Sequence, residues 1–246
     1  MQGQSECLSE NGIVNDAYEY KWLTDALVPL QNPVGENITY SMDQGYDFTP
    51  KTSLTSWLAE HALGAACYGN TNLVPSFCRT YTEMSKRSVL AVHAAKGSTR
   101  ISEWLPGTSI YRILTEKARG AIRKATPERI YFVWLQGESD AIASVTKDEY
   151  KAALRVLCDA LKTDLGIDRF GIIRVGRFTN DDRDTEIISA QDEICREDED
   201  FAMLTDIATE LNEQSEYMNP HVKGHYSAKG LETLGSAAAK VLCQRK

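Results

Sequence analysis

Two continuous apolar runs constrain the fold of this chain most. Residues 88–95 and 129–135 carry mostly apolar side chains, and each run is followed by a short polar stretch that contains glycine. A strand buried on both faces has this composition, whereas a strand with one exposed face alternates. Weaker runs of the same kind occupy residues 171–175 and 201–204. The sequence therefore predicts four strands in a sheet that is covered on both sides.

Amphipathic helices are predicted between and after these strands. Residues 150–165 place apolar side chains on one helical face, and Thr146 with Glu149 forms a capping-box signature ahead of them. Further helical patterns cover residues 187–194 and 231–242. Strands that alternate with helices predict right-handed crossovers and a mainly parallel sheet with helices on both faces. Such sheets place their sites at the carboxyl ends of the strands.

The size and charge of the chain narrow its class. Its 246 residues, 42% of them hydrophobic, are enough for one sizeable core, and no linker divides them, so residues 1–246 are expected to form a single domain. The net charge of −8 argues against nucleic acid or an anionic membrane as a partner, because both attract clustered Lys and Arg. No stretch has the length and apolarity of a membrane span or the layout of a signal peptide. The oligomeric state stays open.

The six cysteines are widely scattered and have no metal-ligand spacing, so no metal site is predicted. Buried, small apolar side chains are the favoured interpretation, with a Cys67–Cys78 bridge as the alternative.

Residues 6–50 differ from the rest. They are rich in Asn, Asp, Tyr and Gly and show little periodicity beyond residues 18–30. Two interpretations stay open, an ordered surface excursion that walls a site and a simple loop.

Ser5 and His225 are the candidate nucleophile and base. Ser5 lies in Gly3-Gln4-Ser5, and a serine attacks only when a base takes its proton and donors stabilise the oxyanion. His225 follows a glycine and precedes a predicted helix start, which would hold its ring on a loop. His221 competes for the same role. His61 and His93 fall in apolar stretches, where a core histidine is expected.

Gly97 and Gln136 follow the two strongest strands and are candidate oxyanion donors. Gly97 would let a backbone N–H approach without obstruction, and Gln136 would donate from its amide. The structural alternatives are a strand-ending turn for Gly97 and a buried, hydrogen-bonded amide for Gln136.

Glu138 and Asp140 allow a different chemistry, because paired carboxylates can act as the acid and base of a glycosidase. In an extended segment the two would point the same way, too close for the inverting geometry. A structural hydrogen bond or ion pair is favoured for at least one of them.

These motifs occur in one order along nearly the whole chain: Gly3-Gln4-Ser5, then Lys96-Gly97-Ser98-Thr99 with Glu103-Trp104, then Gln136-Gly137-Glu138-Ser139-Asp140, then Gly224-His225-Tyr226-Ser227. Together they resemble the SGNH-hydrolase superfamily, in particular its sialate O-acetylesterase and acetylxylan esterase branch of carbohydrate esterases. The block at residues 136–140 is the most specific of the four.

The resemblance implies a flavodoxin-like three-layer α/β/α sandwich and removal of acetyl groups from acetylated carbohydrates without metal or cofactor. It implies that Ser5 attacks the ester carbonyl and that His225 relays the proton. The backbone N–H groups of Ser5 and Gly97 and the Gln136 amide would then face the oxyanion, and an acyl-enzyme would form.

Three departures from the family pattern bear on activity. Glu6 stands where Asn is common and puts negative charge beside the nucleophile. Val222 stands where the acid three residues before the histidine is usual, so Asp206, Glu210 or a backbone carbonyl would orient the ring, or a Ser-His dyad would suffice. No apolar strand precedes Gly3, so we expect the first strand to be truncated. The chain would be cytoplasmic if complete and secreted if an N-terminal segment is missing.

Three functions are therefore weighed. An O-acetylesterase comes first, with Trp22, Trp104 and tyrosines as sugar-stacking surfaces or as core residues. A catalytically silent carbohydrate-binding protein of the same fold comes second. A glycosidase that uses Glu138 and Asp140 comes third.

Overall fold

The computed structural model describes residues 13–32, 34–35, 72–179, 181–220 and 224–244. The elements are the strands β1 (Ile13–Lys21), β2 (Ala26–Gln31), β3 (Val89–Ala91), β4 (Tyr131–Trp134), β5 (Arg169–Ile173) and β6 (Phe201–Thr205), the helices α2 (Val74–Ser85), α3 (Ser109–Ala125), α4 (Glu138–Ile142), α5 (Lys147–Leu165), α6 (Arg183–Glu197), α7 (Ala208–Asn212) and α8 (Ala228–Gln244), and the 3₁₀ turns η2 (Ile101–Trp104) and η3 (Ser215–Tyr217).

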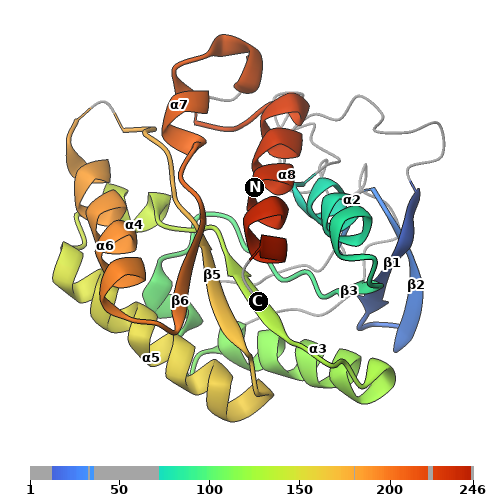
Figure 1. The fold of residues 1–246 in the computed structure, drawn as a ribbon. Helices are drawn as coiled ribbons and strands as arrows, with labels where there is room; N and C mark the ends of the chain where they lie inside the picture. The colour runs from blue at the N-terminus through green and yellow to red at the C-terminus, as the bar shows by residue number, and fades with distance from the viewer. Residues whose placement is uncertain (1–12, 33, 36–71, 180, 221–223, 245–246) are drawn as a thin grey trace, which may run out of the picture.

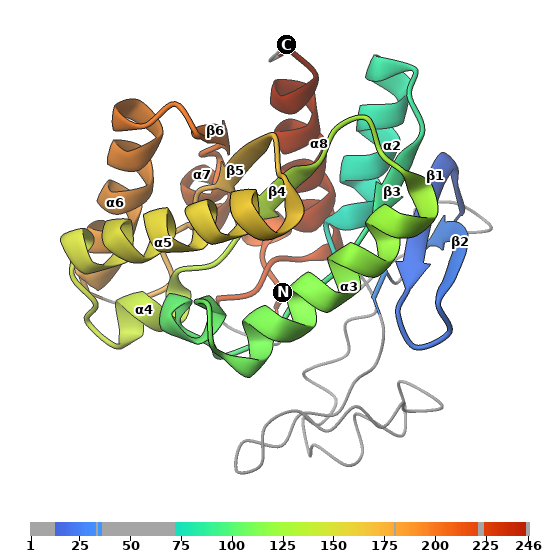
Figure 2. The same ribbon diagram turned by 90° about the horizontal axis from the view of Figure 1, so that it is seen from below.

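The strands form two ladders. One has the order β4-β5-β6 with all strands parallel; the other has the order β2-β1-β3, with β1 parallel to β3 and antiparallel to β2. Helices α3, α5 and α6 lie on one side of the strands and α2 and α8 on the other (Figures 1 and 2). The predicted α/β sandwich with a mainly parallel sheet is thus confirmed.

Alternation along β5 divides the core into two halves. Phe170 and Ile172 are fully buried in the cluster that α3, α5 and α6 cover, whereas Ile173 belongs to the cluster beneath α7 and α8. A strand with buried side chains on both faces has no polar alternation, which explains its continuous apolar sequence.

Helix α5 begins where its capping signature predicts. The Thr146 side chain accepts a hydrogen bond from the backbone N–H of Glu149, and the Glu149 carboxylate accepts from the N–H of Thr146 at 3.0 Å. Behind this cap, Tyr150, Leu154, Leu157 and Leu161 are fully buried. The helix therefore holds its first-turn tyrosine at a fixed place beneath the end of β4.

Two predictions are corrected here. The run at 88–95 forms a strand only over Val89–Ala91, because the chain then leaves the ladder toward Gly97. Within 6–50, both weighed interpretations missed a β-hairpin at residues 13–31 that extends the sheet. Its charged residues hid it: Glu19 is 1% exposed and is neutralised by Lys21, whose Nζ lies 2.7 Å from its carboxylate.

Cys78 and Cys158 are buried free thiols, and burial raises the pKa of each to about 12. They take the apolar role that was favoured from sequence, and Cys78 is not half of a disulfide. Cys67, the partner weighed for it, lies outside the described residues.

Candidate active site

The loops that follow β3 and β4 meet at one edge of the fold. The Nε2 of Gln136, two residues after β4, donates to the backbone carbonyl of Thr99 at 2.9 Å. Thr99 lies just after Gly97 in the loop that follows β3. This bond brings together the two motifs that sequence reasoning placed at the carboxyl ends of strands.

Gln136 makes polar contacts at both ends of its amide. Its Nε2 donates to Thr99 O and to Asp140 Oδ2, and its Oε1 accepts from the Tyr150 hydroxyl at 3.0 Å. Both N–H groups of the amide therefore have protein acceptors, so an oxyanion would have to replace one of them. A charged oxygen is a stronger acceptor than the neutral Thr99 carbonyl, and the exchange is favourable for that reason. The oxyanion role of Gln136 stays a prediction.

Gly137 turns the chain from β4 into α4. Its φ is 152°, and a Cβ built there would lie 2.6 Å from Ile187 Cγ2. Helix α4 starts at the next residue, so Glu138 and Asp140 are helical, not extended as assumed from the sequence. Successive helical residues are rotated by about 100°, so the two carboxyl groups point in different directions.

Asp140 is 1% exposed and serves as an anchor. Its Oδ2 accepts hydrogen bonds from Ile101 N at 2.9 Å and from Gln136 Nε2, while Oδ1 has no partner among the described residues. Burial raises its pKa, and the bond from Gln136 opposes that shift. Asp140 thus connects the start of η2 to the Gln136 amide, an arrangement that leaves it no open path to a glycosidic bond.

The carboxyl group of Glu138, at the start of α4, is affected by the charge of the candidate base His225. Burial raises the pKa of its carboxyl group, while the charge of His225 lowers it, as do hydrogen bonds from the backbone N–H groups of Glu138 and Gly137. The neighbouring Tyr226, 4% exposed, has a pKa raised first by burial and then by the charge of Glu138. The structure therefore groups Glu138 with His225 and Tyr226, a relationship that sequence reasoning missed.

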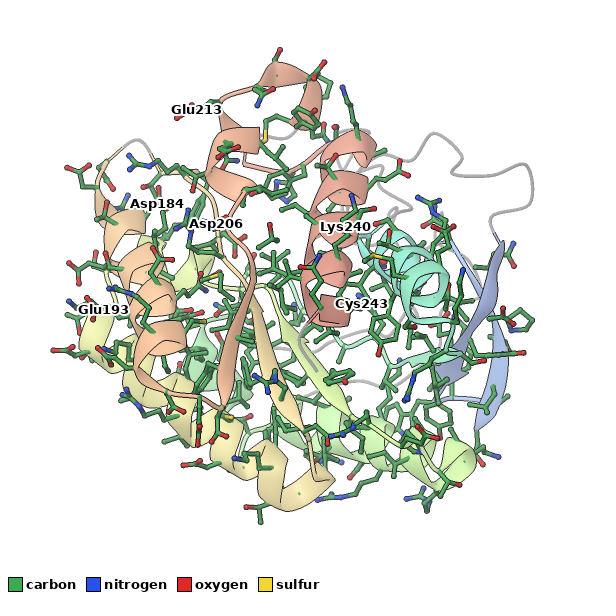
Figure 3. The ribbon with its side chains drawn as sticks, viewed as in Figure 1. Asp184, Glu193, Asp206, Glu213, Lys240 and Cys243 are labelled. Atoms are coloured by element: carbon green, nitrogen blue, oxygen red, sulfur yellow. The ribbon has the colours of Figure 1, made fainter. Side chains whose placement is uncertain are left out.

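The backbone around His225 is held on both sides. The His225 carbonyl accepts from the N–H of Asn219 at 2.8 Å, and Tyr226 pairs with Met218 in an isolated antiparallel bridge. Asp206 and Glu210, weighed as partners of the ring, are both exposed, and Asp206 follows β6 directly (Figure 3). The charge of His225 does affect the carboxyl group of Glu138.

Ser5, Glu6, His61, His221 and Val222 lie outside the described residues. Gly97 is exposed, and a Cβ built on it would meet no atom within 4 Å, so its backbone has the free approach that an oxyanion donor needs. Trp104 is 5% exposed, with its indole N–H on Thr99 Oγ1 at 3.0 Å. Its ring packs edge-on against Trp134, so it is a core residue and not an open sugar-stacking surface.

His93 is a poor general base. Burial is the largest cause that lowers the pKa of its imidazole to about 3, and positive charges, including those of Lys117 and Lys21, add to it, so the ring stays neutral near neutral pH and accepts a proton only weakly. A core role was expected for it from the sequence.

The lowered pKa of this half-buried imidazole makes the stability of the fold depend on pH. The imidazole binds a proton less readily in the folded state, where its pKa is about 3, than in the unfolded state, where it is about 6.5. The folded state is therefore fully favoured above pH 6.5, and this stability is lost as the pH falls from there toward 3. At pH 5 we expect a loss of about 2 kcal/mol from this residue. Urea unfolding of wild type and His93→Gln at pH 7.5 and pH 5 measures it. Equal losses in both proteins would contradict the assignment.

The parallel strands flanked by helices form an α/β sandwich that is consistent with an SGNH-like fold. The chain belongs to the carbohydrate esterase family of sialic acid-specific acetylesterases, whose family model matches residues 59–244.

Known proteins agree with this assignment. A probable carbohydrate esterase of Arabidopsis thaliana is 23% identical over 176 residues, which cover 71% of this chain and 66% of that protein. The X-ray structure of an Arabidopsis thaliana protein superposes with a TM-score of 0.59 at 18% identity, covering 99% of this chain and 95% of that one. The crystal structure of NanS gives 0.58 at 13% identity, with coverages of 98% and 94%. These two structures share the fold.

Among the described residues, no helix has the length and apolarity needed to cross a membrane. Within the same residues, no group of three or more His, Cys, Asp and Glu side chains could hold a metal ion.

Proposed function

We propose that this protein is a serine O-acetylesterase that removes acetyl groups from carbohydrates, with Ser5 as nucleophile and His225 as base. The observation that carries the proposal is the hydrogen bond from Gln136 Nε2 to Thr99 O, which brings the Gln136 amide and the Gly97 loop, the sources of two proposed oxyanion donors, to one edge of the sheet. The charge of His225 also lowers the pKa of Glu138, the first residue of α4. A carboxylate beside an imidazole stabilises the imidazolium ion that forms when the ring takes a proton. Membership of the carbohydrate esterase family supports the same chemistry.

The proposed reaction has two halves. Ser5 Oγ attacks the acetyl carbonyl carbon while its proton passes to His225, and the carbonyl electrons move onto the oxygen. The oxyanion is stabilised by the N–H groups of Ser5 and Gly97 and by Gln136 Nε2. When it collapses, the bond to the sugar oxygen breaks and His225 returns the proton to that oxygen. Water then attacks the acyl carbon while His225 takes its proton; the bond between that carbon and Ser5 Oγ breaks, His225 returns the proton to Oγ, and acetate leaves.

Glu138 takes the place of the acid that the sequence lacks at position 222. We propose it as the group that stabilises the protonated ring of His225. Burial raises the pKa of the Glu138 carboxyl group and the charge of His225 lowers it, so the carboxylate form is favoured in the step in which the ring becomes protonated. Helix α4, which begins at Glu138, fixes its backbone relative to β4.

A silent carbohydrate-binding protein is the alternative, and Glu6 favours it. A carboxylate beside the nucleophile opposes the negative charge that develops on the carbonyl oxygen. The glycosidase proposal loses its geometric basis, because Asp140 is an internal anchor.

Acetate release separates these functions. Wild type should release acetate from O-acetylated sialic acid or from acetylated xylan, and comparison of the two names the substrate class. If Glu6 hinders the oxyanion, Glu6→Asn should raise kcat by about tenfold. Sugar binding without acetate release, in wild type and in Glu6→Asn, would contradict the esterase and support the silent binder.

A further inference from the structure

The hydroxyl of Tyr150 lies at the centre of a buried network to which the proposed reaction assigns no role. Tyr150 is in the first turn of α5 and is fully buried. Its oxygen lies 3.2 Å from Trp134 Nε1 and 3.2 Å from Gln191 Nε2. It also lies 2.8 Å from the Gln136 carbonyl oxygen and 3.0 Å from Gln136 Oε1.

The neighbours of this hydroxyl fix the direction of its proton. The indole N–H of Trp134 can only donate. Gln191 Oε1 accepts from the backbone N–H of Val175 at 2.9 Å, so the Nε2 end of Gln191 faces the tyrosine and donates as well. Two donors occupy the two lone pairs of the hydroxyl, and its single hydrogen must point to the oxygens of Gln136.

The proton of Tyr150 in turn fixes the amide of Gln136. The hydroxyl is within reach of both oxygens of Gln136, and the backbone carbonyl also accepts from Gln191 Nε2 at 2.8 Å. With Oε1 facing the Tyr150 hydroxyl, Nε2 is turned to the opposite side, where Thr99 O and Asp140 Oδ2 accept from it. Thr99 belongs to the Gly97 loop, so this is the side on which the second proposed oxyanion donor lies.

We propose that Tyr150 is a positioning residue that holds the Gln136 amide in the orientation in which it donates to the oxyanion; this inference rests on the proposed esterase function. In the resting state the amide has three partners, Thr99, Asp140 and Tyr150. When the oxyanion replaces the Thr99 carbonyl as an acceptor from Nε2, Asp140 and Tyr150 are the partners that still hold the amide. Tyr150 therefore matters more in the transition state than in the substrate complex, and its loss acts on kcat more than on KM.

A double-mutant cycle tests whether Tyr150 acts through Gln136. Tyr150→Phe should lower kcat for p-nitrophenyl acetate about tenfold and change KM by no more than about twofold. The reason is that a Gln136 amide held less firmly stabilises the oxyanion less well. In a Gln136→Ala background the same substitution should leave kcat unchanged, since the group it positions is gone.

Tyr111→Phe is the matched control. The Tyr111 hydroxyl donates to Asp164 at 2.7 Å, and its ring is buried on α3, so the substitution also removes one hydrogen bond from a buried tyrosine. It should leave kcat within about twofold. A general loss of rigidity would lower kcat in both variants.

An NMR measurement on wild type covers the case in which Tyr150→Phe fails to fold. The side-chain amide protons of Gln136 should exchange with water much more slowly than those of an exposed glutamine; exchange at the rate of an exposed glutamine would overturn the proposal. An unchanged kcat in Tyr150→Phe would also overturn the proposal, as would an equal loss of kcat in the wild-type and Gln136→Ala backgrounds. Equal hydrolysis by wild type and Ser5→Ala instead removes the proposed function, and the role of Tyr150 in catalysis with it.

Discussion

Replacing His225 by alanine is expected to lower kcat for acetyl ester hydrolysis by about 10⁴-fold or more, the scale on which loss of a base from a nucleophile–base unit acts. The reason is that Ser5 then has no group to take its proton, and the sugar oxygen has none to return it. The fold should survive, because the hydrogen bond between Asn219 and residue 225 uses the backbone carbonyl and not the ring.

Ser227→Ala is the control for this variant in the same segment. Ser227 Oγ accepts from the backbone N–H of Gly230 at 3.2 Å and so caps α8. Its loss should cost about 1 kcal/mol of stability and leave kcat nearly unchanged. His225→Ala with kcat within tenfold of wild type, measured on protein shown to be folded, would mean that another group acts as the base.

Glu138→Gln is expected to have the second-largest effect, lowering kcat by about 10²- to 10⁴-fold. The substitution keeps the shape of the side chain and removes the charge that stabilises the His225 imidazolium ion. KM should change little, because the proposed role of Glu138 is to stabilise charge that develops on the base as the reaction proceeds. Steady-state kinetics on an acetyl ester measure both constants.

Glu213→Gln is its control, because Glu213 is exposed at the end of α7 (Figure 3). It should keep full activity. If Glu138→Gln also keeps kcat within about twofold, His225 works without an acid and the Ser-His dyad weighed from the sequence is the better description. Cleavage of p-nitrophenyl glycosides by wild type but not by Glu138→Gln would instead restore the glycosidase proposal.

Local signals allowed the central elements to be predicted from the sequence. The capping residues Thr146 and Glu149 placed the start of α5, and the apolar composition of residues 129–135 placed β4. Both of these signals depend only on residues that are close together in the sequence. The β1–β2 hairpin was missed because Glu19 and Lys21 neutralise each other inside the fold, which no alternation of apolar and polar residues reveals.

The site was predicted less completely. Gln136 was proposed as a site residue, but its surroundings depend on Tyr150 and Gln191, which come from two later helices. The effect of the His225 charge on Glu138 is likewise a long-range relationship that spacing alone does not indicate. The extended conformation assumed for residues 136–140 was wrong because Gly137, with a φ of 152°, starts a helix directly after the strand. The sequence signal for that turn was Gly137, which lies between Gln136 and Glu138.

Covalent labelling tests the central claim most directly. A fluorophosphonate reacts with serines that a neighbouring base has activated, and mass spectrometry locates the adduct. We predict one adduct per chain, on Ser5, that forms with wild type and is lost in Ser5→Ala and strongly slowed in His225→Ala. No adduct on wild type that hydrolyses acetyl esters, or an adduct on another residue that Ser5→Ala leaves unchanged, would contradict the assignment of Ser5 and His225 as the reacting pair.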